Sequence, residues 1–459
     1  MTHRPARRPF GSCPSVPART NRFLPTSTCS RTIRSLMTNT RTLVPETALT
    51  GTARPKSERL TSLDQFRGYT VVGMMLVNYF GGYKACPQVL RHTHDYCSYA
   101  DTIMPHFLFA VGFALRLTFG RRMQADGSAA AYGRMIRRLL GLVLVALVVY
   151  NVGPRAESWE ALVQMGPWEA IREPLKRSWF QTLMHIAVTS LWILPVVCGS
   201  PRLRIGWMLG SAFAHVGLSY WFNFQWVNTG ANGIDGGPLG FLTWTIPAII
   251  GTLACDVFTR PRGELGFGSP ALSRIAVAAV LIMSVGYLIS CGTRLYDVPP
   301  DRVESLKAVK LADDSVWPSG QRVADKVALA KTEGLGSWFA EPPFVKPPEK
   351  EDRKWNYWMM SQRGGTLAYL VFSAGFSLLV YLLFFIACDL GGYQLAFFRT
   401  FGTNALVAYV LHSMVSNAVQ PFFPKDSPAW YAYAGLALFF WITWLFVRHL
   451  EKQGAYLRA

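Results

Sequence analysis

Long uncharged stretches, each bounded by charged residues, Pro or Gly, recur along the chain from Gly68 onward. Ten of them approach the 17 to 25 residues or so that a helix needs to cross the hydrocarbon core of a bilayer. They centre on residues 68–83, 102–119, 139–154, 178–199, 205–223, 237–255, 273–292, 364–388, 400–422 and 429–447. The pattern therefore predicts an all-α fold, a polytopic transmembrane bundle of about ten helices.

The segments between these stretches divide the chain further. Residues 1–55 carry nine Arg and a single acid, Glu46, which is typical of a transit peptide, a disordered cytoplasmic tail or a tract before a later start at Met37. We divide the rest of the chain into four parts. Residues 56–292 hold predicted helices one to seven, 293–363 form an insertion, 364–447 hold helices eight to ten, and 448–459 form a tail. The insertion is rich in Lys, Asp, Glu and Pro and has one helix-like segment, Val323 to Thr332, so we expect a small cap or a loop without fixed structure.

Basic residues gather in alternate connectors. By the positive-inside rule these connectors face the cytoplasm. The second connector is flanked by Arg116, Arg121, Arg122, Arg134, Arg137 and Arg138. Both termini are then cytoplasmic, and the connectors 84–101, 155–177 and 224–236 lie outside together with the insertion.

Composition agrees with a membrane protein. Only 16% of the 459 residues are charged, 51% are hydrophobic, and the net charge is +19. Soluble domains carry about 25% charged residues. The basic excess lies in a terminal tract and short connectors, which argues against a nucleic-acid partner. Eight Cys are too sparse for a disulfide scaffold.

The densest group of polar residues follows the first helix. It holds Asn78, His92, His94, Asp95 and Asp101. A neutral imidazole can accept a proton from a weak nucleophile or carry an acyl group, with a carboxylate to orient it. The alternative is a loop histidine without a chemical task. A zinc site lacks a recognised spacing, so no metal is expected, and Cys86 and Cys97 are either free thiols or one disulfide.

Other candidates for substrate contact are more scattered. Asn232 and Asp235 form a turn or bind sugar hydroxyls, and Arg363 anchors at the headgroups or binds an anion. Asn404 and His412 in the ninth stretch form helix-to-helix hydrogen bonds or line a substrate path.

Four stretches of the sequence form recognisable motifs. The first is Arg59-Leu-Thr-Ser-Leu-Asp-Gln-Phe-Arg-Gly68, which runs into a helix ending in Val77-Asn78-Tyr79. It is followed by a His-bearing loop and by Ala100-Asp101-x-x-x-Pro105-x-Phe-x-Phe-x-x-Gly112. Later come Asp235-Gly-Gly-Pro leading to Ile-Pro247-Ala-Ile, and Phe401-Gly-Thr-Asn404. In this order the motifs resemble the heparan-alpha-glucosaminide N-acetyltransferase family of membrane acyltransferases.

The resemblance implies acetyl transfer from cytosolic acetyl-CoA, as a co-substrate, to a glucosamine amine on the far side of the membrane. It assigns the chemistry to Asn78 and to His92 or His94, because two His stand here where the family has one followed by Trp. Asn78 then donates a hydrogen bond to the oxyanion. The long donor would rest its phosphates on Arg67, Arg116, Arg137 or Arg138, which otherwise only set topology. Ser361-Gln-Arg363 departs from the family's Asn-Lys stretch.

We therefore expect an acyltransferase that moves an acetyl or short acyl group from a coenzyme A thioester to an extracytoplasmic sugar amine or hydroxyl. We expect membrane lipid and a glycan acceptor as its partners. Whether the protein forms a homodimer is left open by the sequence. The alternative is a transporter or flippase with a His/Asp proton pathway. A third reading is an acyltransferase scaffold that has lost its activity and only binds.

Overall fold

The computed structural model describes residues 60–150, 152–153, 155–230, 232–260, 264–298, 311–347 and 353–456. The predicted basic tract 1–55 lies outside these residues, as do the last three residues of the tail. The α-helices of the described part are α1 (Thr61–Phe80), α2 (Ile103–Asp126), α3 (Ser128–Val149), α4 (Trp159–Glu173), α5 (Thr182–Ile193), α6 (Pro201–Leu218), α7 (Phe224–Asn228), α8 (Phe241–Phe258), α9 (Pro270–Ser290), α10 (Gly320–Glu333), α11 (Leu367–Phe384), α12 (Ala396–Thr403), α13 (Ala405–Val419) and α14 (Ala429–Lys452).

The all-α prediction is confirmed. The described residues contain no β-strand, only two isolated bridges. Every one of the ten predicted stretches overlaps a helix or a pair of helices. Among the described residues, five helical segments are long and apolar enough to cross a membrane: Ala100–Asp126, Gly237–Phe258, Pro270–Tyr296, Leu367–Leu390 and Ala429–Lys452. The count of ten spans stays a prediction.

The remaining helices are shorter or more polar. Helix α1 carries Asp64 and Arg67, and α3 carries three arginines in its first half. Helix α5 has 12 residues. The ninth stretch is two helices, because the backbone at Asn404 leaves the helical region (φ −127°, ψ 46°) between α12 and α13.

Glycines allow the helices to pack backbone against backbone. A Cβ on Gly112 of α2 would lie 1.9 Å from the carbonyl oxygen of Ala248 in α8, and one on Gly251 would lie 2.1 Å from that of Phe109. Gly68 of α1 and Gly402 of α12 meet in the same reciprocal way, with 1.8 and 1.9 Å to the facing carbonyls. Small residues at such crossings are how helices approach closely in membranes. Three of these glycines belong to the motifs quoted above.

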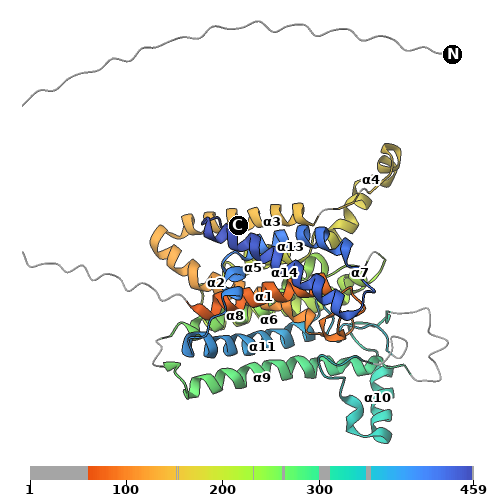
Figure 1. Cartoon of the computed structure of the whole chain (residues 1–459). Coiled ribbons are helices and arrows are strands. Elements are labelled where there is room, and N and C mark those ends of the chain that lie inside the picture. The colour runs from red at the N-terminus through yellow and green to blue at the C-terminus, as the bar shows by residue number, and fades with distance from the viewer. Residues whose placement is uncertain are drawn as a thin grey trace, which may run out of the picture. The chain divides into compact units, whose positions relative to one another are not determined.

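The connectors group at two opposite ends of the helices (Figure 1). At one end the backbone N–H of Phe344 donates to Cys97 O at 2.9 Å, and that of Lys84 donates to Lys425 O at 2.8 Å. At the other end Asp389 accepts from the first backbone N–H groups of α1, at 3.0 and 3.2 Å, and so caps that helix. We call these the insertion end and the capped end. The capped end also holds the turn between α2 and α3. Because arginines flank this turn, the capped end is basic.

The described part of the insertion is folded, as one of the two alternatives proposed. The predicted segment 323–332 lies within α10. The guanidinium of Arg353, with 6% of its side chain exposed, donates to Asp297 and Glu341 at 2.7 Å each. These ion pairs join the beginning of the insertion, at Asp297, to its later part, at Glu341 and Arg353. Figure 1 shows α10 beyond the end of α9, which runs beside α11.

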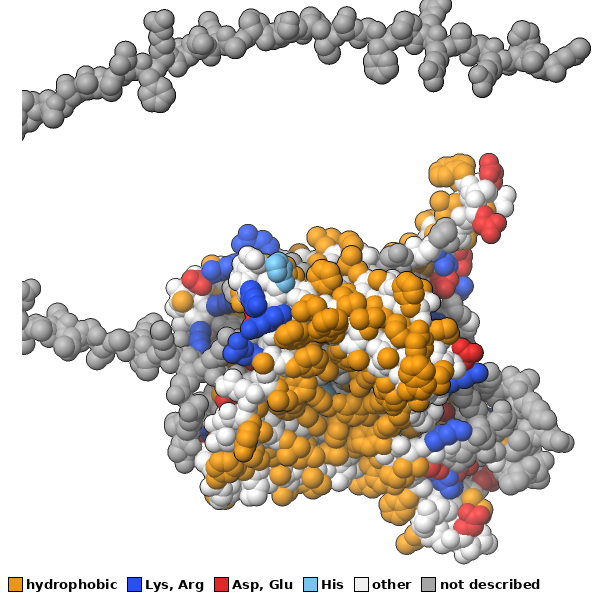
Figure 2. Space-filling model, viewed as in Figure 1, with side chains coloured by type: hydrophobic (Ala, Val, Ile, Leu, Met, Phe, Trp, Pro, Cys, Tyr) orange, Lys and Arg blue, Asp and Glu red, His pale blue; other side chains and the backbone are white. Residues whose placement is uncertain are grey.

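Two helices present their apolar side chains to the outside. Of an apolar stretch of 18 residues in the segment that contains α8, 72% is buried in the protein. The same share is only 17% for the segment of α9 and 28% for α14. Figure 2 shows the resulting apolar face, with basic side chains gathered at its border. Such a face is stable in contact with lipid tails rather than with water.

Candidate functional site

His92 is held by a buried carboxylate. Its Nδ1 lies 2.9 Å from Oδ1 of Asp101, and 42% of the His92 side chain is accessible whereas Asp101 has none exposed. Because a carboxylate oxygen accepts, Nδ1 donates, and the lone pair of a neutral imidazole is then on Nε2. This arrangement fixes the tautomer and the direction of the ring.

The second oxygen of Asp101 is surrounded by donors of its own loop. The backbone N–H of Ser98 donates to Oδ2 at 3.0 Å, and the hydroxyls of Thr93 and Ser98 each lie 2.9 Å from it. A buried carboxylate with several hydrogen bonds has a fixed position. The connector after α1 is therefore folded around Asp101.

Asn78 is the one exposed residue of α1. Its Nδ2 lies 3.3 Å from Nε2 of His412 in α13. His412 Nδ1 donates to the backbone carbonyl of Tyr409, so in the neutral ring Nε2 accepts and the Asn78 amide donates. The contact orients the amide and leaves its second N–H for another acceptor.

A third connector brings in Asp235. Gln362 Nε2 donates to Asp235 Oδ1 at 3.1 Å, and Trp244 Nε1 donates to its backbone oxygen at 2.8 Å. Asp235 has a positive φ of 55°, which a short polar residue tolerates best. The backbone N–H of Gly236 donates to Arg363 O at 2.9 Å, so this turn and the start of α11 are joined.

Four of these residues, Asn78, His92, Asp235 and Gln362, line one cavity of about 220 Å³ at the insertion end. Its lining residues are Met74, Val77, Asn78, His92, Ala100, Ile103, Met104, Phe107, Gln181, Thr182, Ile234, Asp235, Gln362 and Tyr409. The walls are mostly apolar with a few convergent polar groups, which is typical of a small-molecule site. We call it the histidine cavity.

The two charged groups that line the histidine cavity shift each other's pKa. Burial raises the pKa of Asp235 to about 7, although the Gln362 hydrogen bond and the charge of His92 lower it. Burial lowers the pKa of His92, but the hydrogen bond and charge of Asp101, together with Asp235, raise it more, so the net pKa lies above the usual value. Perturbed groups in a cleft are typical of functional sites.

A second cavity of about 320 Å³ adjoins the first. It is lined by Arg67, Phe107, Ala110, Val111, Arg138, Leu142, Leu183, Ile186, Thr403, Ala405, Leu406 and Tyr409. Phe107 and Tyr409 line both cavities. Arg67 and Arg138 come from helices whose nearer termini are at the capped end, so we call this the arginine cavity.

The structure does not bring all predicted site residues together. His94 and Asn232 do not line the histidine cavity, and the Arg363 guanidinium lies over the ring of Trp355, 5.0 Å from its centroid. Asn404 is at the capped end, where its amide donates to Ala455 O at 3.0 Å.

Two of the four predicted phosphate-binding arginines stand apart from the arginine cavity. Arg116 donates to Asp256 at 2.6 Å, and Asp256 also pairs with the buried Arg204. Arg137 is exposed, and its Nε lies 3.4 Å from its own helix at Gly133 O. The ion pairs of Arg116 and Arg204 hold α2 and α6 to α8.

Cys86 and Cys97 are free thiols. Each Sγ lies 3.5 Å from the carbonyl oxygen of the residue that follows it. Within the described ranges no three His, Cys, Asp or Glu are placed to hold a metal ion.

Gln362, Phe107 and Tyr409 line the cavities without a role assigned to them from the sequence. Phe107 lies in a motif quoted above, whereas Tyr409 lies in none. His412, a candidate for a helix contact or a substrate path, contacts Asn78 but lines neither cavity. Gln362 was quoted as part of a stretch that departs from the family, and this departure is the one signal that pointed to it.

The fold and the site define a class: a helical membrane protein with a polar cavity, built around an imidazole and a carboxylate, among its helices. Residues 59–283 match the model of the family "Heparan-alpha-glucosaminide N-acetyltransferase, catalytic", which confirms the resemblance seen in the sequence motifs. The match includes Asn78, His92 and Asp235, and it ends before Gln362 and Tyr409. A comparison with curated proteins finds no match.

Proposed function

We propose that the protein transfers an acetyl group from a coenzyme A thioester on the cytoplasmic side of the membrane to an amine or hydroxyl of an extracytoplasmic sugar. The catalytic-domain match supports acetyl transfer. The capped end, which carries the arginine-rich connectors, is then cytoplasmic together with both termini, as the positive-inside rule favours.

The observation that carries this proposal is the pair of adjoining cavities. The histidine cavity lies at the insertion end and the arginine cavity continues from it, with Phe107 and Tyr409 as shared walls. A hydrocarbon core of about 30 Å separates the two sides. A thioester donor on one side can reach an acceptor on the other only if a space between the helices connects them, and in the proposal the two cavities are that space.

The arginine cavity fits the donor by its chemistry. Guanidinium groups bind phosphates by paired hydrogen bonds and keep their charge when partly buried. Arg67 and Arg138 are the cations of this cavity. In the proposal they bind the donor's phosphates, and the apolar walls accommodate its extended arm.

His92 acts in the transfer through Nε2, because Nδ1 is bound to Asp101. As general base, Nε2 takes the proton of the acceptor amine or hydroxyl while that atom attacks the thioester carbonyl and the thiolate leaves. As acyl carrier, Nε2 attacks the carbonyl itself and the thiolate leaves; the acceptor then attacks the acetyl-imidazole, frees Nε2, and its proton ends on the thiolate. The net change is the same: acetyl thioester plus acceptor give free thiol plus acetylated acceptor.

Asn78 stabilises the oxyanion in either route. Its amide is oriented by His412 and faces the same cavity as His92. The N–H that His412 does not use points to no other described partner and donates to the carbonyl oxygen as negative charge develops there.

The test compares His92→Ala with His94→Ala in the purified full-length protein. We expect His92→Ala to lower transfer from radiolabelled acetyl-CoA to a glucosamine acceptor by about 100-fold or more. His94→Ala, which removes an imidazole from the same loop, should stay within about threefold of wild type.

Acid-quenched protein without acceptor separates the two routes, because label retained on the wild type indicates the acyl carrier. Full activity of His92→Ala would refute the catalyst. Proton-driven uptake without any acyl donor would instead favour the transporter.

A further inference from the structure

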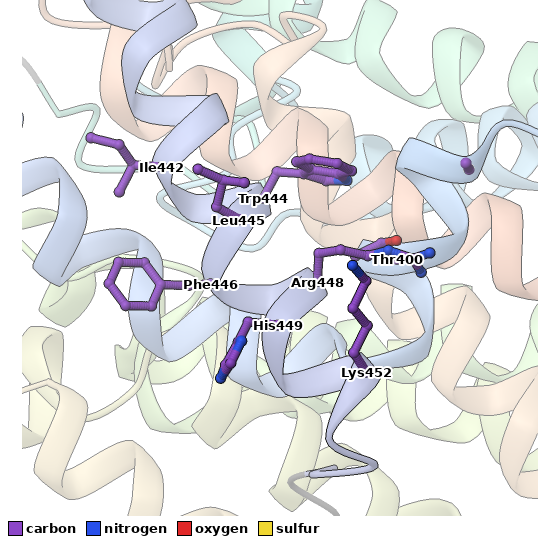
Figure 3. Close-up of a pocket in the computed structure, with 9 residues that line it drawn as sticks. Thr400, Ile442, Trp444, Leu445, Phe446, Arg448, His449 and Lys452 are labelled. Atoms are coloured by element: carbon purple, nitrogen blue, oxygen red, sulfur yellow. The ribbon is translucent and has the colours of Figure 1, made fainter.

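A large groove lies along the last helix, away from both cavities described above. It has a volume of about 780 Å³ and is lined by Ala396, Thr400, Ile442, Trp444, Leu445, Phe446, Arg448, His449 and Lys452. Figure 3 shows Phe446 and His449 on one side of α14, and Trp444 and Arg448 on the side that faces Thr400 of α12. The groove therefore combines apolar walls with a basic end at the last turns of α14.

The apolar walls face outward. Leu445 is 45% exposed and Phe446 is 53% exposed. Both lie on α14, which is long and apolar enough to span a membrane. Side chains of this kind on a spanning helix contact acyl chains. The walls thus lie where a lipid tail runs, and the basic end lies at the level of the headgroups.

The positive charge at the basic end is only partly neutralised. Arg448 donates to Glu451 at 2.6 Å, and the Thr400 hydroxyl donates to the same carboxylate oxygen at 3.0 Å. Arg399 lies 4.0 Å from its other oxygen. Within the described part of the chain, neither Lys452 nor His449 takes part in an ion pair, so the groove keeps a cationic rim.

We propose that this groove is a binding site for an anionic phospholipid. Its acyl chain lies along Ile442, Leu445 and Phe446, and its phosphate accepts hydrogen bonds from Lys452 and His449. Charge complementarity selects a lipid with a net negative headgroup over a zwitterionic one, because each basic residue near the surface adds an attraction to anionic lipid. Lipid binding in this groove does not depend on any step of the acetyl-transfer reaction.

The test measures binding of fluorescent phosphatidylglycerol to the full-length protein in neutral detergent, with competition by unlabelled phosphatidylglycerol and phosphatidylcholine. We expect phosphatidylglycerol to compete at least about fivefold better. The double variant His449→Gln/Lys452→Gln should weaken phosphatidylglycerol binding by about fivefold or more and reduce the preference over phosphatidylcholine.

The control is Lys84→Gln/Lys425→Gln, which removes two exposed lysines at the opposite end. Its lipid affinity should equal that of wild type. A third variant, Leu445→Trp, narrows the groove without changing charge and should weaken binding of both lipids. Both double variants change only exposed side chains, and thermal unfolding checks that they fold.

Three results would overturn the proposal: equal affinity for the two lipids, equal weakening by the control, or no effect of the groove variants. A stable dimer that the groove variants dissociate, and that lipid does not disturb, would assign the groove to a second copy of the chain and would also overturn it.

Discussion

At the scale of single residues, the site depends on the groups that surround the reactive imidazole. His92 is oriented by the hydrogen bond from Nδ1 to Asp101, it also interacts with Gln362, and its ring lines the cavity. Asp235 lies close enough for its charge to raise the pKa of His92. The fall of activity at low pH, which follows protonation of His92, therefore depends on the charge of Asp235.

Asp235→Asn should move that limb. The negative charge of Asp235 favours the protonated imidazole, so its removal lowers the pKa of His92. Catalysis needs the neutral ring, and activity rises with pH through this pKa. We expect the acid limb of kcat/KM to move to lower pH by up to about one unit. An unchanged limb, or one moved to higher pH, would show that Asp235 does not act on His92.

Asn78→Ala should affect turnover more than binding. The amide hydrogen bond to an oxyanion exists in the transition state, so its loss lowers kcat by about 100- to 1,000-fold and leaves KM nearly unchanged. Steady-state kinetics with acetyl-CoA and a glucosamine acceptor measure both. A rise in KM at constant kcat would assign Asn78 to substrate binding instead.

His92 and Asp101 were predictable together because they stand nine residues apart in one polar connector. Asp235 was predictable as a candidate from its turn. The contacts of Gln362 with Asp235 and of His412 with Asn78 were not predictable, because the partners lie 127 and 334 residues apart in sequence and meet only through helix packing. Among the arginines, sequence could not separate Arg67 from Arg116, since only the fold shows that Arg116 pairs with Asp256.

At the scale of helices, the apolar stretches predicted the positions of the elements well. They could not predict the break at Asn404, which divides the ninth stretch, because a single Asn within an apolar run is also compatible with a continuous helix. They also could not predict which helices touch. The reciprocal glycines of α2 and α8 determine that contact through backbone approach.

Gly251→Ala should therefore destabilise the bundle. Its Cβ would lie 2.1 Å from a backbone oxygen of α2, so the two helices must separate. We expect a loss of about 1–3 kcal/mol or more in unfolding free energy. Gly210→Ala on α6 is the control, because nothing lies within 4 Å of its Cβ and Ala favours the helix.

Thermal unfolding in detergent compares the two variants with wild type. A Gly251→Ala protein as stable as Gly210→Ala would contradict the close crossing of α2 and α8. In that case the shape of both cavities would need another explanation, since Phe107 lies on the same helix as Gly112.

At the scale of the whole molecule, the proposed transfer needs the two cavities that share Phe107 and Tyr409. The histidine cavity is formed by three connectors of the insertion end, and the arginine cavity by helices that carry the basic connectors. Charge asymmetry in the sequence predicts that these two groups of residues face opposite sides of the membrane, and the vesicle experiment below tests this. The adjoining walls at Phe107 and Tyr409 became visible only in the folded chain.

The most direct test of this account is transfer across a sealed membrane. The protein is reconstituted in one orientation into vesicles, with radiolabelled acetyl-CoA on the side of the basic connectors and a glucosamine acceptor on the other side. We expect acetylated acceptor only when donor and acceptor are on opposite sides in this arrangement. Acetylation that occurs only with both on the same side would contradict the account.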